Sequence, residues 1–431
     1  MAPSPQRTPF PRVFWIANLI EVLERFAYYG IYFSFGIYLT SLGFSRDQLG
    51  FVQTLFLLLS YCLPLFSGTL ADRFGFKTML IVAYLAYLPA ILLLILTKTF
   101  SGIALTMLSI GFAAGLFKPL IIGTVRAVTD KTNSTLGFGI FYAMVNVGGS
   151  LGPVILGRLR AISWDYAFYA AGATIGLMLV ITLLFYKEPK RELERKSIGE
   201  KLREIGEALS DRRFALFLFL LGLGFWIPFW GFFNLCALYV DSSLDTARLY
   251  QDLRGVLGAT VADFLSHEEG GQRRILGETI SHTGYIIMIL QVFVSRGIER
   301  FRPIPTFFTG LAVMAAGFLV LGAAASVAST LVFLGILLFA AGEMVASPRI
   351  QEYIARLAPK EKAGLYVGTN FLAVGVGAFS GVLYTPIYGR LAEAGHPGWV
   401  WYVIAAHVVA GIAALALFQR LAGTMEERTE G

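Results

Sequence analysis

The sequence predicts an all-α membrane protein with 12 transmembrane helices in two bundles of six. Three observations support this fold class. Hydrophobic residues make up 56% of the chain and charged residues only 15%, which is typical of a polytopic membrane protein and excludes an ordinary soluble domain. Apolar segments of about 20 residues, the length that spans a bilayer, recur along the whole chain. One long polar segment, residues 188–212, separates six of them from the other six.

The apolar segments give the predicted order of the spans. We place the 12 helices at 13–42, 47–71, 77–97, 101–127, 134–159, 164–187, 213–240, 278–296, 304–326, 329–357, 363–390 and 397–420. The chain then divides into an N-terminal six-helix bundle at 1–187, a cytoplasmic linker at 188–212 and a C-terminal six-helix bundle at 213–431. The second bundle carries an external insertion at 241–277.

Basic residues gather in alternate loops, and this pattern predicts the topology. The loops of one side carry Arg73, Lys77, Arg126, Lys131, Arg296, Arg300, Arg302, Lys360 and Lys362. The positive-inside rule makes that side cytoplasmic, together with the linker and both termini, in the plasma or inner membrane. We expect no cleavable signal peptide, because Arg7 and Arg12 lead directly into a span longer than the apolar region of such a peptide.

Three charges inside the first span mark the segment around which the chain is organised. From Val13 to Leu42 the only ionised side chains are Glu21, Glu24 and Arg25. Each costs roughly 2.5–3.5 kcal/mol at the centre of a membrane helix, so such groups face a bundle interior and pair with one another. Glu21 and Arg25 are four residues apart, on one helix face, with Glu24 beside them. The cluster either binds helices together or couples transport to protons, and we favour proton coupling.

The same stretch carries a family resemblance. Residues 21–30, E-x-x-E-R-F-x-Y-Y-G, resemble the first-helix signature of the proton-dependent oligopeptide transporter family, within the major facilitator superfamily. The loop at 68–77 is similar to the superfamily motif G-x-L-x-D-R-x-G-x-K. F-Y-x-x-x-N-x-G at 141–148 and G-E-x-x-x-S-P at 342–348 resemble further signatures of the peptide transporters. The resemblance implies the major facilitator fold and proton-coupled transport of small peptides.

Two isolated charges are further site candidates. Lys118 is the only charge between Lys98 and Arg126, and Glu343 lies in the apolar part of the span at 329–357. To snorkel to the inner end of its helix, Lys118 would have to cover about 13 Å of helical rise, so a functional lysine is the better interpretation. We expect Lys118 and Glu343 to meet across the two halves, where a zwitterionic substrate exchanges with the pair.

Aromatic residues separate this chain from the usual peptide-transporter pattern. Peptide transporters usually pair a glutamate of the seventh helix with an arginine of the first, and this chain has Trp230 and Tyr32 at those positions. The two charges are absent together, as expected because a lone buried charge is costly. Aromatic side chains favour a more apolar or aromatic substrate. The expected substrate contacts are Tyr28, Tyr29, Tyr32, Lys118, Asn146, Trp226, Trp230 and Glu343.

The loop at 68–77 is the predicted gate. Its glycines allow a tight turn and a close approach of helices, and Asp72 is placed to pair with a cation such as Arg126 or to cap a neighbouring helix. We assign gating to Asp72, Arg73 and Arg126. A weaker copy of the motif, Gly297–Phe301, occupies the matching position in the second half.

Two amphipathic helices are predicted outside the spans. In the linker, apolar residues at helical spacing predict a helix on the inner membrane surface; they are Ile198, Leu202, Ile205 and Leu209. In the insertion, a similar stripe predicts a surface-lying cap helix. Its members are Leu249, Leu253, Val256, Leu257, Val261, Phe264 and Leu265.

Several functions remain open. The first is a proton-coupled symporter of small peptides or peptide-like zwitterions that works by alternating access. The alternative is a proton-coupled exporter of an amphipathic or drug-like compound, because Gly139, Gly148, Gly152, Pro153 and Gly157 resemble the fifth-helix motif of drug–proton antiporters. A membrane receptor or scaffold is disfavoured, since it has no reason to keep charges in three membrane helices.

An enzyme is disfavoured more strongly. The sequence offers no nucleophile–base pair, metal cluster or phosphate loop, and Cys62 and Cys236 lie in apolar segments without ligand spacing. We therefore expect no cofactor and no metal. The expected partners are protons, a small substrate and the lipid bilayer, with the protein acting as a monomer. The net charge of +7 reflects membrane topology rather than nucleic-acid binding.

Overall fold

The structure is a computed structural model in which helices make up almost all of the described chain. It describes residues 8–130, 132–190, 197–357 and 363–422. The all-α membrane class is confirmed. Among the sequence predictions, residues 191–196 of the linker, Arg7, and three loop lysines lie outside the described residues; these lysines are Lys131, Lys360 and Lys362.

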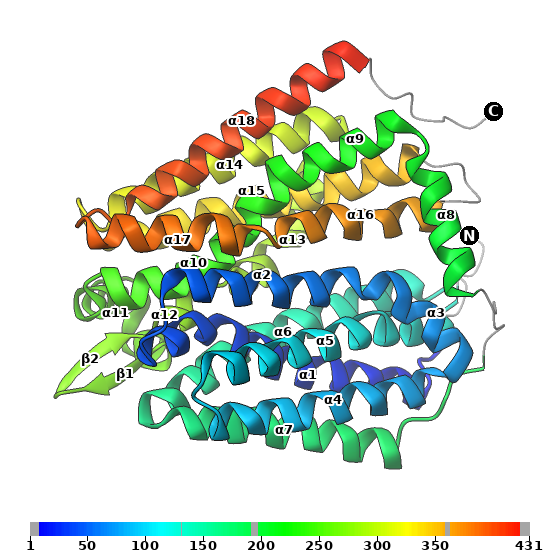
Figure 1. The fold of residues 1–431 in the computed structure, drawn as a ribbon, viewed down its shortest axis with the longest axis horizontal. Helices are drawn as coiled ribbons and strands as arrows, with labels where there is room; N and C mark the ends of the chain where they lie inside the picture. Colours follow the sequence, from blue (N-terminus) through cyan, green and yellow to red (C-terminus); the bar gives the residue numbers. More distant parts are fainter. Residues whose placement is uncertain (1–7, 131, 191–196, 358–362, 423–431) are drawn as a thin grey trace, which may run out of the picture. The chain divides into compact units, whose positions relative to one another are not determined.

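The chain divides into two compact units. The first unit contains Met1–Tyr32 and Cys62–Lys201, and the second contains Phe33–Tyr61 and Leu202–Gly431. Residues 33–61 therefore group with the second unit, and the predicted six-helix bundles stay a prediction. The helices that lie wholly or partly in the first unit are α1 (Arg12–Ser41), α3 (Pro64–Phe74), α4 (Phe76–Leu96), α5 (Phe100–Ala127), α6 (Ser134–Ile162) and α7 (Trp164–Leu184) (Figure 1).

The second unit holds the remaining elements. In chain order they are α2 (Arg46–Cys62), α8 (Ile198–Leu209), α9 (Arg212–Leu221), a π-helical turn (Gly222–Trp226), α10 (Ile227–Ser243), α11 (Thr246–Phe264), β1 (Ser266–Glu269), β2 (Gln272–Ile275), α12 (Gly277–Ile280), α13 (Gly284–Ile298), α14 (Pro303–Ala324), α15 (Leu331–Leu357), α16 (Ala363–Gly377), α17 (Ser380–Glu393) and α18 (Trp399–Ala422) (Figure 1). Helix α8 begins in the first unit and continues into the second.

The predicted spans correspond to helices of the structure. By length and composition, nine helices of the described chain could cross a membrane, or ten if the bent pair α2 and α3 forms one span. The predicted spans at 13–42 and 278–296 match α1 and α13. Helix α1 has 30 residues but carries three charges near its centre, and α13 has only 15 residues. Both are therefore poorer membrane helices by composition or length than the others.

The amphipathic helix of the linker is present as α8. It spans Ile198–Leu209, and its residue Ile205 is buried, whereas Leu202 is exposed. The structure thus confirms the helix that the apolar spacing in the linker predicts. Its position at a membrane surface stays a prediction.

The insertion contains more than the predicted cap helix. Helix α11 is present, but Gly258 has a φ of 82°, which kinks it. Leu249 and Leu253 are buried before the kink, whereas the side chain of Val256 is 82% exposed. An antiparallel hairpin of β1 and β2 follows, which the sequence analysis did not predict. Its turn contains Gly270 and Gly271, both with positive φ, as a tight two-residue turn requires.

Candidate functional site

Helix α1 brings the three predicted proton-coupling residues together. The Nε of Arg25 donates a hydrogen bond of 2.7 Å to Oε1 of Glu21 and lies 3.1 Å from Oε2 of Glu24. All three side chains are buried. Burial removes the water that would otherwise stabilise their charges, so each relies on the others. The pairing that the helical spacing predicts is present, and the role in proton coupling stays a prediction.

Two other helices of the first unit complete this cluster. The hydroxyl of Tyr87 on α4 donates a hydrogen bond of 2.7 Å to Oε1 of Glu24. The Nζ of Lys118 on α5 lies 5.1 Å from the ring centre of Tyr28, within the fields of both carboxylates. We call the four charged residues the charged quartet: Glu21, Glu24, Arg25 and Lys118. When all four are ionised, two negative and two positive charges balance, with the glutamates and Arg25 buried and Lys118 partly buried.

The three tyrosines that we expect to contact substrate, Tyr28, Tyr29 and Tyr32, lie on α1 next to the charged quartet. The rings of Tyr28 and Tyr32 stack with centres 6.0 Å apart, and Tyr29 contacts Tyr28 edge-on at 5.1 Å. The guanidinium carbon of Arg25 lies 5.6 Å from the ring centre of Tyr28 and 5.9 Å from that of Tyr29. Cations are favoured over aromatic faces, so the tyrosines help to hold Arg25 in place. Asn146 instead donates to the backbone oxygen of Tyr142 in its own helix.

Glycines of α6 allow α1 to approach closely. A Cβ atom on Gly148 would overlap the backbone oxygen of Val22, and one on Gly152 would overlap that of Phe26. Both contacts lie on the stretch of α1 that bears Glu21, Glu24 and Arg25. Gly139, by contrast, has nothing within 4 Å of its Cβ position. Close packing against α1 is therefore the structural reason for two of the glycines in this motif.

The predicted substrate residues of the second unit lie in or near an aromatic cluster. The ring of Trp230 lies 4.8 Å from that of Tyr61 and 5.7 Å from that of Phe233. Trp226 ends a π-helical turn, a feature often found at functional sites. Its indole nitrogen is buried and has no hydrogen-bond partner among the residues that the structure describes. Such a donor is available to a ligand.

Glu343 receives a hydrogen bond within the second unit. The hydroxyl of Thr283, which directly precedes α13, donates to Oε2 of Glu343 at 2.9 Å. Lys118 belongs to the first unit and Glu343 to the second, so their expected pairing stays a prediction. Sequence reasoning missed Thr283 and also Tyr87. The one available signal was a hydroxyl in an otherwise apolar segment, which is too common to single out a site.

The segment predicted as the gate loop, residues 68–77, is mostly helical: residues 68–74 belong to α3, residues 76–77 begin α4, and only Gly75 lies between the two helices. Gly75 has a φ of 88°, which glycine tolerates, and α4 begins directly after it. The carboxylate of Glu188 accepts hydrogen bonds of 2.8 Å from the backbone nitrogens of Phe76 and Lys77. A carboxylate at this position satisfies free N–H groups and the helix dipole. Glu188 thus caps α4, a contact that sequence reasoning also missed.

The charged side chains of that gate loop have different surroundings. Arg73 is exposed, and its guanidinium carbon lies 5.3 Å from the ring centre of Phe74. Arg126 is exposed near the end of α5, whereas Asp72 is partly buried. The pairing of Asp72 with Arg126 and the gating role of all three predicted residues stay predictions.

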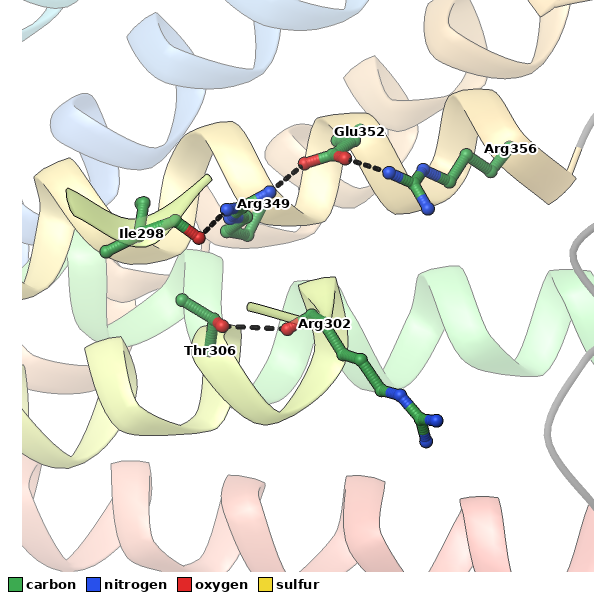
Figure 2. A network of polar contacts seen from close by, with 6 residues as sticks. All are labelled: Ile298, Arg302, Thr306, Arg349, Glu352 and Arg356. Carbon is green, nitrogen blue, oxygen red and sulfur yellow. Dashed lines mark hydrogen bonds and ion pairs between the residues drawn. The ribbon is translucent and has the colours of Figure 1, made fainter. Parts of the chain in front are cut away.

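The second-half copy of the loop motif is tied to α15. Arg349, only 5% exposed, donates a hydrogen bond to the backbone oxygen of Ile298, the last residue of α13 (Figure 2). Arg349 also pairs with Glu352, which pairs in turn with Arg356. The last carbonyls of a helix have no partner within it, and a cation is favoured there. This network therefore fixes the end of α13 against α15.

Comparisons with known proteins agree with a transporter. The family model of the Major Facilitator Superfamily matches residues 17–266. The quinolone resistance protein NorA of Staphylococcus aureus is 28% identical over 155 residues, which are 36% of this chain and 40% of NorA. The chain thus matches about two fifths of the length of this relative. A Na(+), Li(+), K(+)/H(+) antiporter of Planococcus maritimus is 23% identical over 391 residues, 85% of this chain and 86% of the antiporter.

Solved structures share the fold at low sequence identity. A POT family transporter in complex with 5-aminolevulinic acid superimposes with a TM-score of 0.74 at 18% identity, over 97% of this chain and 99% of that one. The nucleoside transporter NupG gives a TM-score of 0.71 at 14% identity, over 94% and 99% of the two chains. Together with the family match, these likenesses confirm the expected major facilitator fold.

Proposed function

The chain belongs to the Major Facilitator Superfamily, and we propose that this multi-pass membrane transporter couples an inward flow of protons to the uptake of a zwitterionic substrate. Small peptides and peptide-like molecules are the substrate class. Transport proceeds by alternating access, with both termini in the cytoplasm. The protein is a transporter and not an enzyme.

The charged quartet is the observation that carries this proposal. Its two carboxylates and two cations balance only while both Glu21 and Glu24 are ionised. A proton that binds either carboxylate leaves one net positive charge, which is costly in a buried setting. A substrate carboxylate restores the balance when it approaches Lys118. Proton and substrate then bind more favourably together than alone, as symport requires.

The structural likeness supports the same substrate class. The POT family transporter named above was solved in complex with 5-aminolevulinic acid, a molecule with one amino and one carboxylic acid group. Within this chain, Lys118 supplies a cation for a carboxylate and Glu343 an anion for an ammonium group. Trp226 and Trp230 add apolar surface, which favours a substrate with an aromatic or aliphatic side chain.

A second candidate function is proton-coupled export of an amphipathic compound. The buried aromatic cluster around Trp230 and the partial likeness to NorA favour it. The α6 glycines do not decide between the two functions, because the packing of Gly148 and Gly152 against α1 accounts for them structurally.

The direction of the driving pH gradient tests the proposal. Purified protein in liposomes receives a radiolabelled dipeptide or the amphipathic cation ethidium, under a gradient that is acidic either outside or inside. Symport predicts that only the acid-outside gradient accumulates the dipeptide, with empty liposomes as the control. Accumulation of ethidium driven by the acid-inside gradient, without any dipeptide uptake, would establish exchange and overturn the symport proposal.

A further inference from the structure

His282 is a buried histidine of the second unit to which the sites above give no role. It lies between α12 and α13 with its side chain almost fully enclosed, at 4% exposure. Within the described chain, neither of its ring nitrogens has a hydrogen-bond partner. The hydroxyl of the preceding residue, Ser281, is likewise buried and has no hydrogen-bond partner among the described residues. A neutral imidazole carries one donor and one acceptor, so three hydrogen-bonding atoms are left unmet at adjacent positions.

Unmet polar atoms in a protein interior call for an explanation. Leaving a buried donor or acceptor without a partner is unfavourable, and native structures keep few of them. A ligand that brings its own hydrogen-bonding group removes the penalty. Two neighbouring residues with this property therefore point to a place where a polar ligand atom binds.

The surroundings of His282 define what else the ligand must carry. The imidazole centre lies 4.5 Å from the ring centre of Tyr285 and 5.9 Å from that of Phe33. Phe33 in turn lies 5.8 Å from Phe233, which links this group to the aromatic cluster around Trp230. Aromatic rings at these distances favour another ring that stacks or packs edge-on.

The carboxylate of Glu343 is connected to the residues around His282 by one hydrogen bond. Thr283, the residue after His282, hydrogen-bonds Glu343 through its hydroxyl. A carboxylate attracts an ammonium group, and the faces of aromatic rings also attract a cation. Residues 281–283 thus combine unpaired hydrogen-bonding atoms with a direct link to an anion. We name the group of Phe33, Ser281, His282, Thr283, Tyr285 and Glu343 the His282 cluster.

We propose that His282 determines specificity for an aromatic amine that carries a ring hydroxyl. The amine is either free or the first residue of a peptide. Glu343 binds its ammonium group, the rings of Phe33 and Tyr285 pack against its ring, and His282 hydrogen-bonds its hydroxyl. The inference rests on the proposed function, because it names the chemical class of substrate that the second unit binds.

Two amines that differ by one hydroxyl test the inference. Tyramine has the ring hydroxyl and phenethylamine lacks it, and their binding to the full-length protein in detergent is measured by isothermal titration calorimetry. We expect tyramine to bind about tenfold more tightly, the effect of one well-placed hydrogen bond in a buried site. His282→Phe keeps a ring in place but removes both nitrogens. It should abolish the preference and leave phenethylamine binding within about twofold.

Matched variants separate the role of His282 from general damage. His407 lies on α18, where its Nδ1 is 2.5 Å from the hydroxyl of Tyr384, outside the His282 cluster. His407→Phe should keep the tenfold preference. Glu343→Gln should weaken binding of both amines alike. Size-exclusion chromatography and melting temperature verify folding, and His282→Leu, which also lacks hydrogen-bonding atoms, replaces His282→Phe if the latter does not fold.

The binding measurements test the role of His282 separately from proton-coupled transport. Equal binding of the two amines by the unaltered protein overturns it, and so does a preference that survives in the folded His282 variant. Absence of binding by either amine at millimolar concentration overturns it as well. If the hydroxyl preference depends on His282 but neither pH gradient drives transport, the proton-coupled function fails and the binding site remains.

Discussion

Tyr87 donates a hydrogen bond of 2.7 Å to Glu24, across the contact between α4 and α1. Both side chains are fully buried. This bond gives Glu24 a neutral donor in addition to its ion pair with Arg25, whereas Glu21 accepts its hydrogen bond from Arg25. In the part of the chain that the structure describes, Oε2 of each carboxylate has no hydrogen-bond partner. The two carboxylates of the charged quartet thus have different surroundings, and α4 is coupled to the proposed proton site.

Removal of that hydroxyl should impair both folding and transport. Tyr87→Phe leaves one oxygen of Glu24 buried and unpaired, at a cost of about 1–3 kcal/mol. We expect a lower melting temperature in detergent and slower pH-driven uptake. Tyr84→Phe is the matched control, because Tyr84 lies one turn away with a longer, 3.4 Å contact to Thr182. Equal effects of the two substitutions would contradict the assignment.

The contact between α1 and α6 should not tolerate a methyl group. Gly148→Ala forces α1 away from α6 and should destabilise the protein by about 1–3 kcal/mol, the usual range for overpacking. Gly139→Ala has free space around the new methyl group and should be neutral, or stabilising by up to about 1 kcal/mol, since alanine favours helix. Melting temperatures measure both. A neutral Gly148→Ala would show that the close approach is not needed.

Arg349, which caps α13, should contribute more to stability than Arg356, the exposed residue at the end of the same network. Arg349→Ala leaves the terminal carbonyl of Ile298 without its charged donor and should destabilise the second unit by about 2–3 kcal/mol. Arg356→Ala removes only a solvent-exposed partner of Glu352 and should change stability by less than about 1 kcal/mol. Thermal unfolding of both variants gives the comparison. If the Arg356 substitution is the more damaging one, the network does not fix α13 in this way.

The loop at 68–77 is predicted to gate and not to bind substrate. Asp72→Asn should shift the balance between inward- and outward-facing states without changing which substrates bind. The readout is labelling of single cysteines introduced at the two ends of the transport path. Lys98→Gln serves as a control, since Lys98 lies outside this loop and its side chain contacts the backbone oxygen of Leu94. Altered selectivity at unchanged labelling would refute gating by Asp72.

The sequence predicts local features of this structure well. The pairing of Glu21 with Arg25 follows from a spacing of four residues on a helix, which holds wherever the helix packs. Span lengths and the helix at 198–209 follow from apolar periodicity in the same way. The hairpin of β1 and β2 had a local signal too, in the pair Gly270 and Gly271, but its strands have only four residues each and are mostly polar, so they show no apolar alternation.

Contacts between distant segments could not be predicted in this way. Tyr87 meets Glu24, Glu188 caps α4, and Arg349 caps α13 only because particular helices pack side by side. The periodicity of apolar residues predicts which face of a helix is buried, but it does not predict which other segment packs against that face. His282 was missed for a similar reason: an isolated histidine in an apolar segment shows its unpaired nitrogens only after its surroundings are known.

The central claim is that the charged quartet couples substrate movement to protons, and Glu24→Gln tests it most directly. The substitution keeps the shape of the side chain and removes its ability to bind and release a proton. In liposomes, the variant should lose accumulation of dipeptide driven by an acid-outside gradient. It should keep exchange of labelled for unlabelled dipeptide, which needs no net proton movement. Accumulation by the variant against a dipeptide gradient, at the rate of the unaltered protein, would contradict the account.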